Sequence, residues 1–335
     1  MIALTRLVQF RDLDGSRKVA KVLDNDNLQL LENTKSVYDL ATEAIRSHQK
    51  LERVIQEKSS HQSVFDYNQV ISDNRLLPPI GHPDPAHLLV SGTGLDHLGS
   101  ALARDAMHTT DDKEKAMTDS MKMFRMGLEG GKPRIGEVGT QPEWFYKGDG
   151  SSLVPPGHPL ELPGFALDGS EEAEVVGIYV ISETGEVFRV GFTLGNEYSD
   201  HVLERQNYLY LAHSKLRDCS IGPELLIGHL PESVVGQVSV IRDGATIWSS
   251  PFQTGEANMT HLISNIEHHH FKYSQFRRPG DVHCHFLGAS VLSFSSGVTT
   301  RPGDIFEISA PLFGRPLRNS IKKAGTTGLV VVKDL

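Results

Sequence analysis

Cysteines, long apolar runs and clustered basic residues are scarce in this 335-residue sequence. Its two cysteines, Cys219 and Cys284, lie far apart without a CxxC spacing, which predicts free thiols in a reducing compartment. No apolar run approaches the length of a membrane span, and the first residues lack the basic and apolar segments of a signal peptide. We therefore expect a cytoplasmic protein that does not enter a membrane.

Negative charge prevails, with a formal net charge of −9 and no long basic stripe. This balance argues against nucleic acid as the main partner. The hydrophobic content of 39% and the charged content of 22% are typical of a globular protein. The length suffices for one large domain, or for a small domain and a larger one.

The sequence pattern changes near residue 80. Residues 1–35 alternate short apolar and polar runs, which predicts small antiparallel strands. Residues 36–56 carry apolar side chains at helical spacing, which predicts one helix. A proline-rich connector follows and leads into a predicted strand at 87–91.

The remaining chain has a different composition. Residues 98–108 and 111–131 favour helices, the second ended by a Gly-Gly pair. After Lys132, short apolar runs separated by Gly and Pro recur, which is typical of a large mixed-β domain. We therefore expect a domain at 1–80 and a second domain at 81–335.

A pair of carboxylates stands at the head of one of these apolar runs. Glu172 and Glu174 are two residues apart, and strand side chains alternate with period two, so both project from one face. Neighbouring like charges repel, and burying an unpaired carboxylate is costly. Solvent exposure, pairing with Lys or Arg, or a divalent cation would each relieve this, and the spacing leaves all three open.

Histidine and glycine patterns give weaker signals. The run His268–His270 follows a predicted helix, and adjacent residues do not share a helix face, which favours an exposed helix end over a chelating site. His283 and His285 would share a strand face, where a structural role is favoured and metal ligation is the alternative. The GTG at 92–94 lacks the third glycine and the context of a dinucleotide-binding fingerprint.

Several fragments of the second region occur in a recognisable order. They read PEWFYKG, SLVPPGHPLELP, the E-x-E pair, GFTLGNEYSDHVLE, YLYLAHSKLRDCSIGPEL, FLGASVL, RPGDIFEI and GRPLRN. This set, over about residues 82–335, resembles the fumarylacetoacetate hydrolase superfamily. There the pattern runs through F-x-K, a Gly-Pro turn, E-x-E, an acidic strand end, a Lys before a second Gly-Pro turn, PGD and a closing LxN.

The resemblance implies the fold and a metal. We expect an α+β protein, with a mixed β-roll or β-barrel-like catalytic domain after a small α/β N-terminal domain, assembled as a homodimer or a higher homo-oligomer. The family holds one Mg²⁺-type cation, which implies Glu172, Glu174 and Glu197 as ligands here, the last where the family usually has Asp. Because Mg²⁺ and Mn²⁺ prefer oxygen ligands, a metal becomes the favoured explanation of the carboxylate pair.

The resemblance also implies the residues around the metal. Lys215 matches the family's active-site Lys, and Lys147 matches the Lys of F-x-K. A Lys beside a cation can orient a carbonyl, neutralise negative charge, or act as a base if its pKa is lowered. Substrate contacts are implied at Gly92, Ser214 and Ser290.

Two chemistries occur in the family, and both begin with a 2-keto acid that chelates the metal. Hydrolases use a His in a segment like GxNYxxHxxE to activate water. The matching segment here has Leu95 for the Tyr, His97 shifted by one place and no Glu three residues later. The fragment PEWFYKG, with Glu143 as the acid–base candidate, instead resembles the sugar-acid dehydratase branch linked with arabinose-type pentose catabolism.

We therefore expect a Mg²⁺-dependent dehydratase that converts a 2-keto-3-deoxypentonate to 2,5-dioxopentanoate, with this small 2-keto acid as its partner. A C–C bond hydrolase of a 2,4-diketo acid is the alternative. A non-catalytic sugar-acid-binding protein is a third possibility from another class, against which Lys215 and Glu143 argue.

Overall fold

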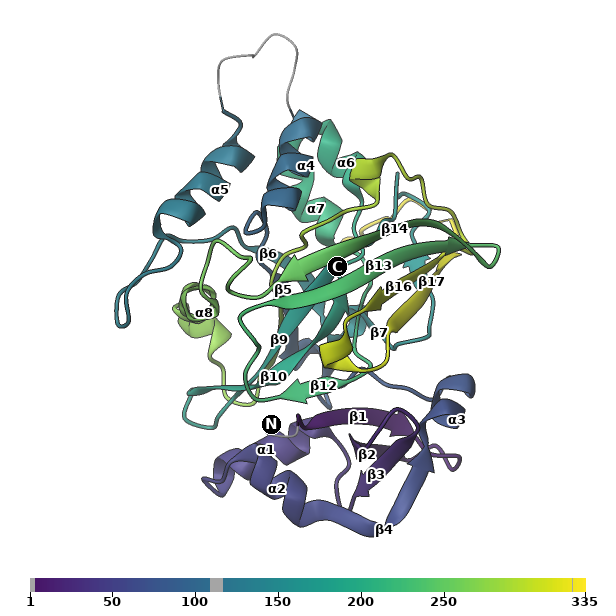
Figure 1. The fold of residues 1–335 in the computed structure, drawn as a ribbon. Helices are drawn as coiled ribbons and strands as arrows, with labels where there is room; N and C mark the ends of the chain where they lie inside the picture. Colours follow the sequence, from purple (N-terminus) through teal and green to yellow (C-terminus); the bar gives the residue numbers. More distant parts are fainter. Residues whose placement is uncertain (1–3, 109–116, 327) are drawn as a thin grey trace.

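The computed structural model describes residues 4–108, 117–326 and 328–335, and its strands form two sheets (Figure 1). The larger sheet has 12 strands, in the order β4-β3-β2-β1-β12-β10-β9-β15-β5-β6, with β11 and β7 attached to the side of β10. The smaller sheet runs β14-β13-β16-β17-β8. Both sheets are mixed in the direction of their strands, and the helices lie around them, so the expected α+β class is confirmed.

The N-terminal region contributes four strands and three helices. They are β1 (Arg6–Arg11), β2 (Arg17–Val22), β3 (Asn27–Leu31), α1 (Val37–Arg46), α2 (Leu51–Lys58), β4 (Ser59–Asp66) and α3 (Tyr67–Ser72). The predicted antiparallel strands within residues 1–35 are confirmed. β1 also pairs with β12 (Leu225–Ile227), so these strands extend the same sheet that carries the rest of the chain. The boundary expected near residue 80 falls in the connector between α3 and β5.

The single helix predicted over 36–56 is wrong. The chain forms α1 and α2 with a break between them, where His48 has a φ of +52° and the α1 carbonyls of Ala44 and Ile45 accept from Gln49 and His48. A residue in the left-handed region cannot continue a right-handed helix. The apolar stripe continues across the break because both helices pack on the same core, and the stripe therefore did not reveal it.

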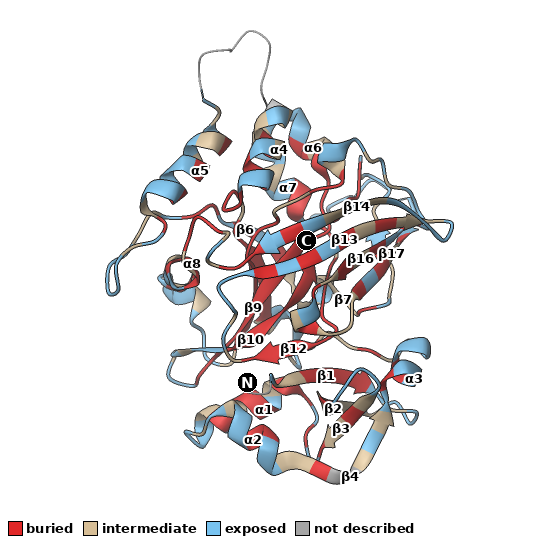
Figure 2. Cartoon of the chain, in the orientation of Figure 1, coloured by how far each residue is buried: buried red, intermediate tan, exposed pale blue. Residues whose placement is uncertain are grey.

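The core of the larger sheet lies around β5 (Leu88–Gly92), β9 (Ala173–Ile181), β10 (Val187–Asn196) and β15 (Val282–Phe286). All nine residues of β9 are buried, as Figure 2 shows. One face, with Val176 and Ile178, packs against α1 and α2. The other face, with Val175 and Phe192, packs against the smaller sheet. Strands covered on both faces read as continuous apolar runs, which explains the sequence of β9.

The smaller sheet consists of β8 (Leu160–Leu162), β13 (Val234–Arg242), β14 (Ala245–Thr254), β16 (Ile305–Ser309) and β17 (Leu317–Lys323). Within the described ranges the strand orders of both sheets are open, so the barrel-like closure expected from the sequence is not found. The expected mixed α+β architecture stands, as two open sheets packed face to face.

The remaining elements are short strands of the large sheet and helices outside it. They are α4 (Leu98–His108), α5 (Asp119–Gly130), β6 (Phe145–Asp149), β7 (Leu153–Val154), α6 (His201–Gln206), α7 (Leu211–Lys215), β11 (Cys219–Ile221) and α8 (Ile263–Phe271). Helices α4 to α7 gather at one end of the molecule (Figure 1). The predicted helix at 98–108 is confirmed, the helix predicted at 111–131 begins at Asp119, and its residues 111–116 lie outside the described part. No described helix has the length and hydropathy needed to span a membrane.

Candidate active site

The antiparallel pairing of β9 with β10 places three carboxylates together. Glu174 lies at the start of β9 and faces Gly195 near the end of β10. Glu172 comes just before β9, and its carbonyl accepts the N–H of Glu197, which follows β10. One strand therefore begins where its neighbour ends, and residues 21 and 25 positions apart in the chain become neighbours.

The three carboxylates form a buried group that can hold a cation. Each of Glu172, Glu174 and Glu197 offers an oxygen within 4.8 Å of the others, and none is more than 6% exposed. Burial, together with the charges of Glu197 and Glu172, raises the pKa of Glu174 well above its usual value. Carboxylates held this close repel one another, and oxygen ligands of this kind are those that Mg²⁺ prefers, so the donor set fits a hard divalent cation.

Lys215, at the end of α7, lies between two of these carboxylates. Its ammonium contacts Glu172 Oε1 and lies 3.0 Å from Glu197 Oε2. It also stands 4.9 Å from the centroid of the Phe145 ring. Burial opposes its charge, but Glu172 and Glu197 outweigh burial and raise its pKa, which favours the ammonium form. The same Lys charge, working against burial, lowers the pKa of Glu172 well below its usual value.

Lys147, on β6, also reaches the group. Its ammonium donates to the carbonyl oxygens of Tyr198 at 2.6 Å and Lys215 at 3.0 Å, and lies 3.4 Å from Glu197 Oε1. The side chain is fully buried. Two lysines predicted from separate motifs therefore converge on Glu197 from β6 and α7.

Glu143 lies just before β6 and is held by an arginine that the sequence did not indicate. Arg104, on α4, donates to both Glu143 oxygens at 2.8 Å and contacts Glu204 Oε1 at 2.7 Å. The Tyr208 hydroxyl donates to Glu143 Oε1 at 3.3 Å. Glu143 lines a pocket of about 480 Å³ that opens beside α5 and α8.

His201 is a second residue that the sequence reasoning missed. Its Nε2 lies 3.1 Å from Glu172 Oε1, and its ring stacks on Phe294 at 5.2 Å between centroids. Burial disfavours its charge, but the contact with Glu172 raises its pKa. Its position between Asp200 and Val202, four residues after Glu197, was the available signal.

The three residues expected to contact substrate have clear surroundings. At Gly92 a Cβ would lie 2.3 Å from the Phe145 ring, so glycine permits this close approach. The Ser214 hydroxyl donates to the Leu211 carbonyl at 2.7 Å inside α7. Ser290 Oγ accepts from the backbone N–H of Gln253 at 3.2 Å. Both serine hydroxyls thus have partners within the protein.

His97 is buried and belongs to a His–Asp pair. Its Nδ1 lies 2.7 Å from Asp96 Oδ1, and its Nε2 lies 3.1 Å from the Thr254 hydroxyl on β14. A Cβ at Gly288 would lie 2.1 Å from Asp96 Oδ1, and the Gly288 N–H donates to Glu174 Oε2. The backbone at Gly288 therefore lies between the His97–Asp96 pair and the carboxylate group.

The exposed helix end expected at His268–His270 is only partly correct. His268 is exposed, but His270 is buried, and its Nε2 lies 3.0 Å from His283 Nδ1 on β15. On a helix, successive residues point about 100° apart, so one histidine of three can face the core while another faces solvent. His283 and His285 are fully buried on one strand face, as the alternation predicted.

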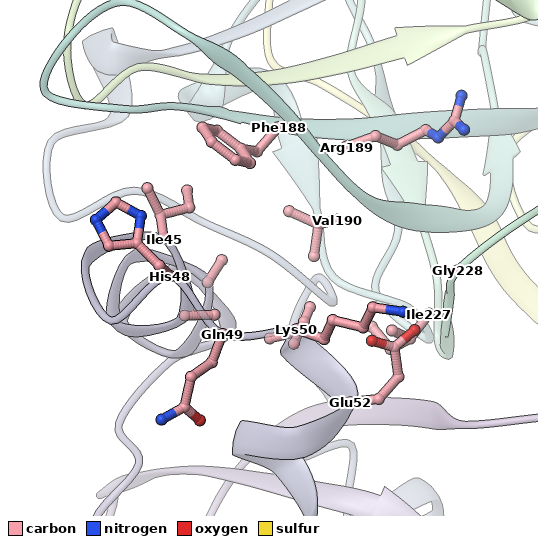
Figure 3. A pocket seen from close by; sticks show the side chains of 13 residues that line it. Ile45, His48, Gln49, Lys50, Glu52, Phe188, Arg189, Val190, Ile227 and Gly228 are labelled. Carbon is pink, nitrogen blue, oxygen red and sulfur yellow. The ribbon is translucent and has the colours of Figure 1, made fainter.

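Another cavity, of about 490 Å³, lies between the α1–α2 region and strands β10 and β12 (Figure 3). Phe188, Val190 and Ile45 form apolar walls, with Lys50 and Glu52 at one end. None of the residues predicted for the site lines it. This cavity therefore does not coincide with the predicted site.

No family model matches the chain. A probable 2-keto-3-deoxyxylonate dehydratase of Haloferax volcanii is 29% identical over 136 residues, which cover 38% of this chain and 45% of the relative, less than half of its length.

Solved structures match over nearly the whole chain. The apo form of 2-keto-3-deoxy-D-arabinonate dehydratase has a TM-score of 0.68 and 19% identity, and the match covers 96% of this chain and 99% of that one. The same enzyme complexed with magnesium and 2,5-dioxopentanoate gives 0.67 and 18%, with the same coverage. A 5-carboxymethyl-2-hydroxymuconate delta-isomerase from Mycobacterium smegmatis gives 0.56 and 16%, covering 95% and 100%.

Both the dehydratase and the isomerase structures are matched over almost their full lengths. The chain therefore has the fold of 2-keto-3-deoxy-D-arabinonate dehydratase and of this isomerase.

Proposed function

We propose that this protein is a Mg²⁺-dependent dehydratase of a 2-keto-3-deoxy sugar acid, with 2-keto-3-deoxypentonate as substrate and 2,5-dioxopentanoate as product. The observation that carries the proposal is the buried Glu172–Glu174–Glu197 group with Lys215 against two of its members. The neighbour of the same fold that binds magnesium and 2,5-dioxopentanoate supports it.

Glu172, Glu174 and Glu197 would hold the cation, Mg²⁺ or alternatively Mn²⁺. When bound, the cation would supply Lewis-acid stabilisation of the negative charge that develops on the 2-keto oxygen. Lys215 supplies a fixed positive charge beside it. Of the three roles open to this Lys, neutralising charge or orienting the carbonyl suits its ammonium state, because its raised pKa opposes a role as base.

Glu143 is the acid–base group in this proposal. The elimination requires one group to remove a C3 proton and a proton donor to assist departure of the C4 hydroxyl, so that one water leaves and tautomerisation gives the dioxo acid. Arg104 and Tyr208 hold the Glu143 carboxylate by hydrogen bonds, and a fixed carboxylate can present the same oxygen to C3 in every turnover.

Lys147 positions Glu197 and the loop before α6 by its bonds to the carbonyls of Tyr198 and Lys215. We further propose that Gly92, Ser214 and Ser290 border the substrate, that residues 1–80 form the N-terminal domain, and that the enzyme is a cytoplasmic homodimer or higher homo-oligomer of pentose catabolism. The two cysteines, both buried and free, suit a reducing compartment.

A substrate panel tests the proposal. Purified protein is incubated with 2-keto-3-deoxypentonates of both C4 configurations, with Mg²⁺, with EDTA, and with Mg²⁺ restored after EDTA. The proposal expects an aldehyde product from at least one isomer, loss of turnover in EDTA and recovery on restoration. Turnover that is indifferent to EDTA would contradict the metal, and the absence of any dioxo acid would contradict the dehydratase.

The His97–Asp96 pair supports a second candidate, the C–C hydrolase of a 2,4-diketo acid. A carboxylate on Nδ1 is the arrangement that prepares a histidine to activate water. Here Nε2 lies against Thr254 in a buried position, which leaves the pair turned toward β14. Cleavage of acylpyruvate in the same panel would select this candidate.

A further inference from the structure

The two histidine runs of the sequence, which the proposed reaction does not use, meet in one buried cluster. His270 of α8 lies between His283 and His285 of β15, with ring centroids at 5.0 and 4.7 Å. The cluster borders the pocket that contains Glu143, because His270 and Trp144 both line that pocket. The cluster therefore connects the central sheet to a wall of the candidate active site.

Hydrogen bonds fix the direction of this connection. The Trp144 indole N–H donates to His270 Nδ1 at 3.0 Å. Burial lowers the pKa of His270 to about 4, so its ring is neutral and its one proton lies on Nε2. That Nε2 lies 3.0 Å from His283 Nδ1, which must then accept. Trp144, His270 and His283 thus form a chain with a single set of tautomers.

The cluster is also anchored to β5. His285 lies 2.9 Å from the hydroxyls of both Ser91 and Thr93, and Thr93 itself lines the pocket. The Phe276 ring stacks on the rings of His270 and Trp144, with distances between ring centroids of 4.9 Å and 5.6 Å. An indole held at its N–H and at its face has little freedom to rotate, so this wall is rigid.

The rest of the described pocket wall carries no Asp, Glu, Lys or Arg side chain, and four of its residues are Trp, Tyr or Phe. Tyr208, Tyr273 and Phe276 face it with Trp144, while Glu143 is the only carboxylate and no Lys or Arg belongs to the described lining. Lys272 approaches from outside and donates to Gln141 Oε1. Arg104 already pairs with Glu143, so a second carboxylate or a phosphate entering here would find no Lys or Arg of its own in the described lining, which is costly in a partly buried site. Aromatic faces instead suit an uncharged part of a substrate.

Resting on the proposed function, we propose that this pocket binds the part of the substrate beyond C4, that Trp144 determines specificity for it, and that His270 is a positioning residue for Trp144. The accepted substrates are 2-keto-3-deoxy acids of five or six carbons in all, with an uncharged, hydroxylated end. A volume of about 480 Å³ exceeds the need of a five-carbon acid, since pockets of 300 to 1,000 Å³ hold drug-sized ligands. Acids with a second carboxylate or a phosphate at the far end are excluded.

The test compares substrates of different length on the Mg²⁺-loaded full chain. The four-carbon acid 4-hydroxy-2-oxobutanoate has no carbon beyond C4, whereas a 2-keto-3-deoxyhexonate has two. Trp144→Ala should lower kcat/KM for the six-carbon acid about tenfold more than for the four-carbon acid, mainly through KM. His270→Phe should reproduce the direction of this change, and Trp248→Phe, at the other tryptophan, is the matched control and should not change the ratio.

Fluorescence supplies a readout that does not need turnover. In the Trp248→Phe protein, Trp144 is the single tryptophan. The six-carbon acid should change its emission saturably, and a 2-keto-3-deoxy acid with a carboxylate at C6 should not. Equal losses for the four- and six-carbon acids in Trp144→Ala, or an emission that ignores the six-carbon acid, would overturn the inference. If neither acid is turned over, the proposed function fails, and the emission titration still decides whether the pocket binds the chain end.

Discussion

Replacing Glu174 by Gln should have opposite effects on stability without and with Mg²⁺. Glu174 belongs to three carboxylates whose oxygens lie within 4.8 Å of one another, and its own hydrogen-bond donor is the neutral N–H of Gly288. Gln keeps the shape and the oxygen that accepts from Gly288 but removes the charge. The substitution therefore isolates the repulsion that a bound cation would relieve.

The magnitude follows from the geometry. Two unit charges 4.8 Å apart interact by about 3 kcal/mol at an effective dielectric constant of about 20. Proton uptake by Glu174, whose pKa is raised, and the charge of Lys215 reduce this to about 1–3 kcal/mol. For a chain of this length we expect a metal-free Tm that is about 1–4 °C higher than that of the wild type.

Mg²⁺ should reverse the order of the two proteins. At a concentration 100 times its Kd, a ligand bound only by the folded state stabilises by about 2.7 kcal/mol, so the wild type gains and the variant does not. Scanning calorimetry in EDTA and then in Mg²⁺ measures both effects. Glu171→Gln is the matched control, since Glu171 is an adjacent buried carboxylate bonded to Ser293, and it should keep the Mg²⁺ response.

A Glu174→Gln protein that is less stable than the wild type in EDTA, and equally stabilised by Mg²⁺, would refute the reasoning. The carboxylate group would then be a structural ion-pair network with Lys215, and the cation would have to bind elsewhere.

Three further predictions concern the chemistry, the assembly and the histidine cluster. Dehydration needs no activated water at C4, so His97→Ala should cost less than tenfold in kcat, while Glu143→Gln and Lys215→Ala should each cost about 10²–10⁴; a reversed order would favour the hydrolase. Multi-angle light scattering at micromolar concentration should give at least a dimer, and a monomer would contradict the assembly. His270 has a pKa of about 4 in the folded protein against an ordinary 6.5, so between these pH values the unfolded chain binds one more proton than the folded chain. The free energy of unfolding should therefore fall by up to about 3 kcal/mol as the pH drops from 6.5 to 4. Denaturant unfolding of His270→Phe should show a shallower decline with pH, whereas parallel pH curves for the variant and the wild type would place His270 in solvent.

The carboxylate group could be predicted from the sequence because its three residues lie at the ends of two neighbouring strands. A period-two spacing puts Glu172 and Glu174 on one face, and an antiparallel partner returns Glu197 to the same end. The motif order, not the spacing, supplied the third ligand and both lysines. The short apolar runs likewise predicted strands such as β9 and β15, whose residues are all buried.

Long-range pairing is what the sequence could not supply. Arg104 reaches Glu143 from a helix 39 residues earlier, and nothing in the helix pattern distinguishes it from a solvent-exposed arginine. His270 is buried only because β15 lies beside α8, and β1 joins β12 across more than 200 residues. The sequence pattern also did not reveal the break at His48. The spacing of apolar residues shows which side chains face the core, but it does not show where the backbone leaves the helical conformation.

The most direct test of the central claim is a reaction in D₂O followed by NMR. With Mg²⁺ and 2-keto-3-deoxypentonate, the account predicts 2,5-dioxopentanoate that carries deuterium at C3, because the elimination begins with cleavage of a C3–H bond, and no reaction in EDTA. Unchanged 2-keto-3-deoxypentonate without deuterium at C3, together with cleavage of a 2,4-diketo acid into two fragments, would contradict the account.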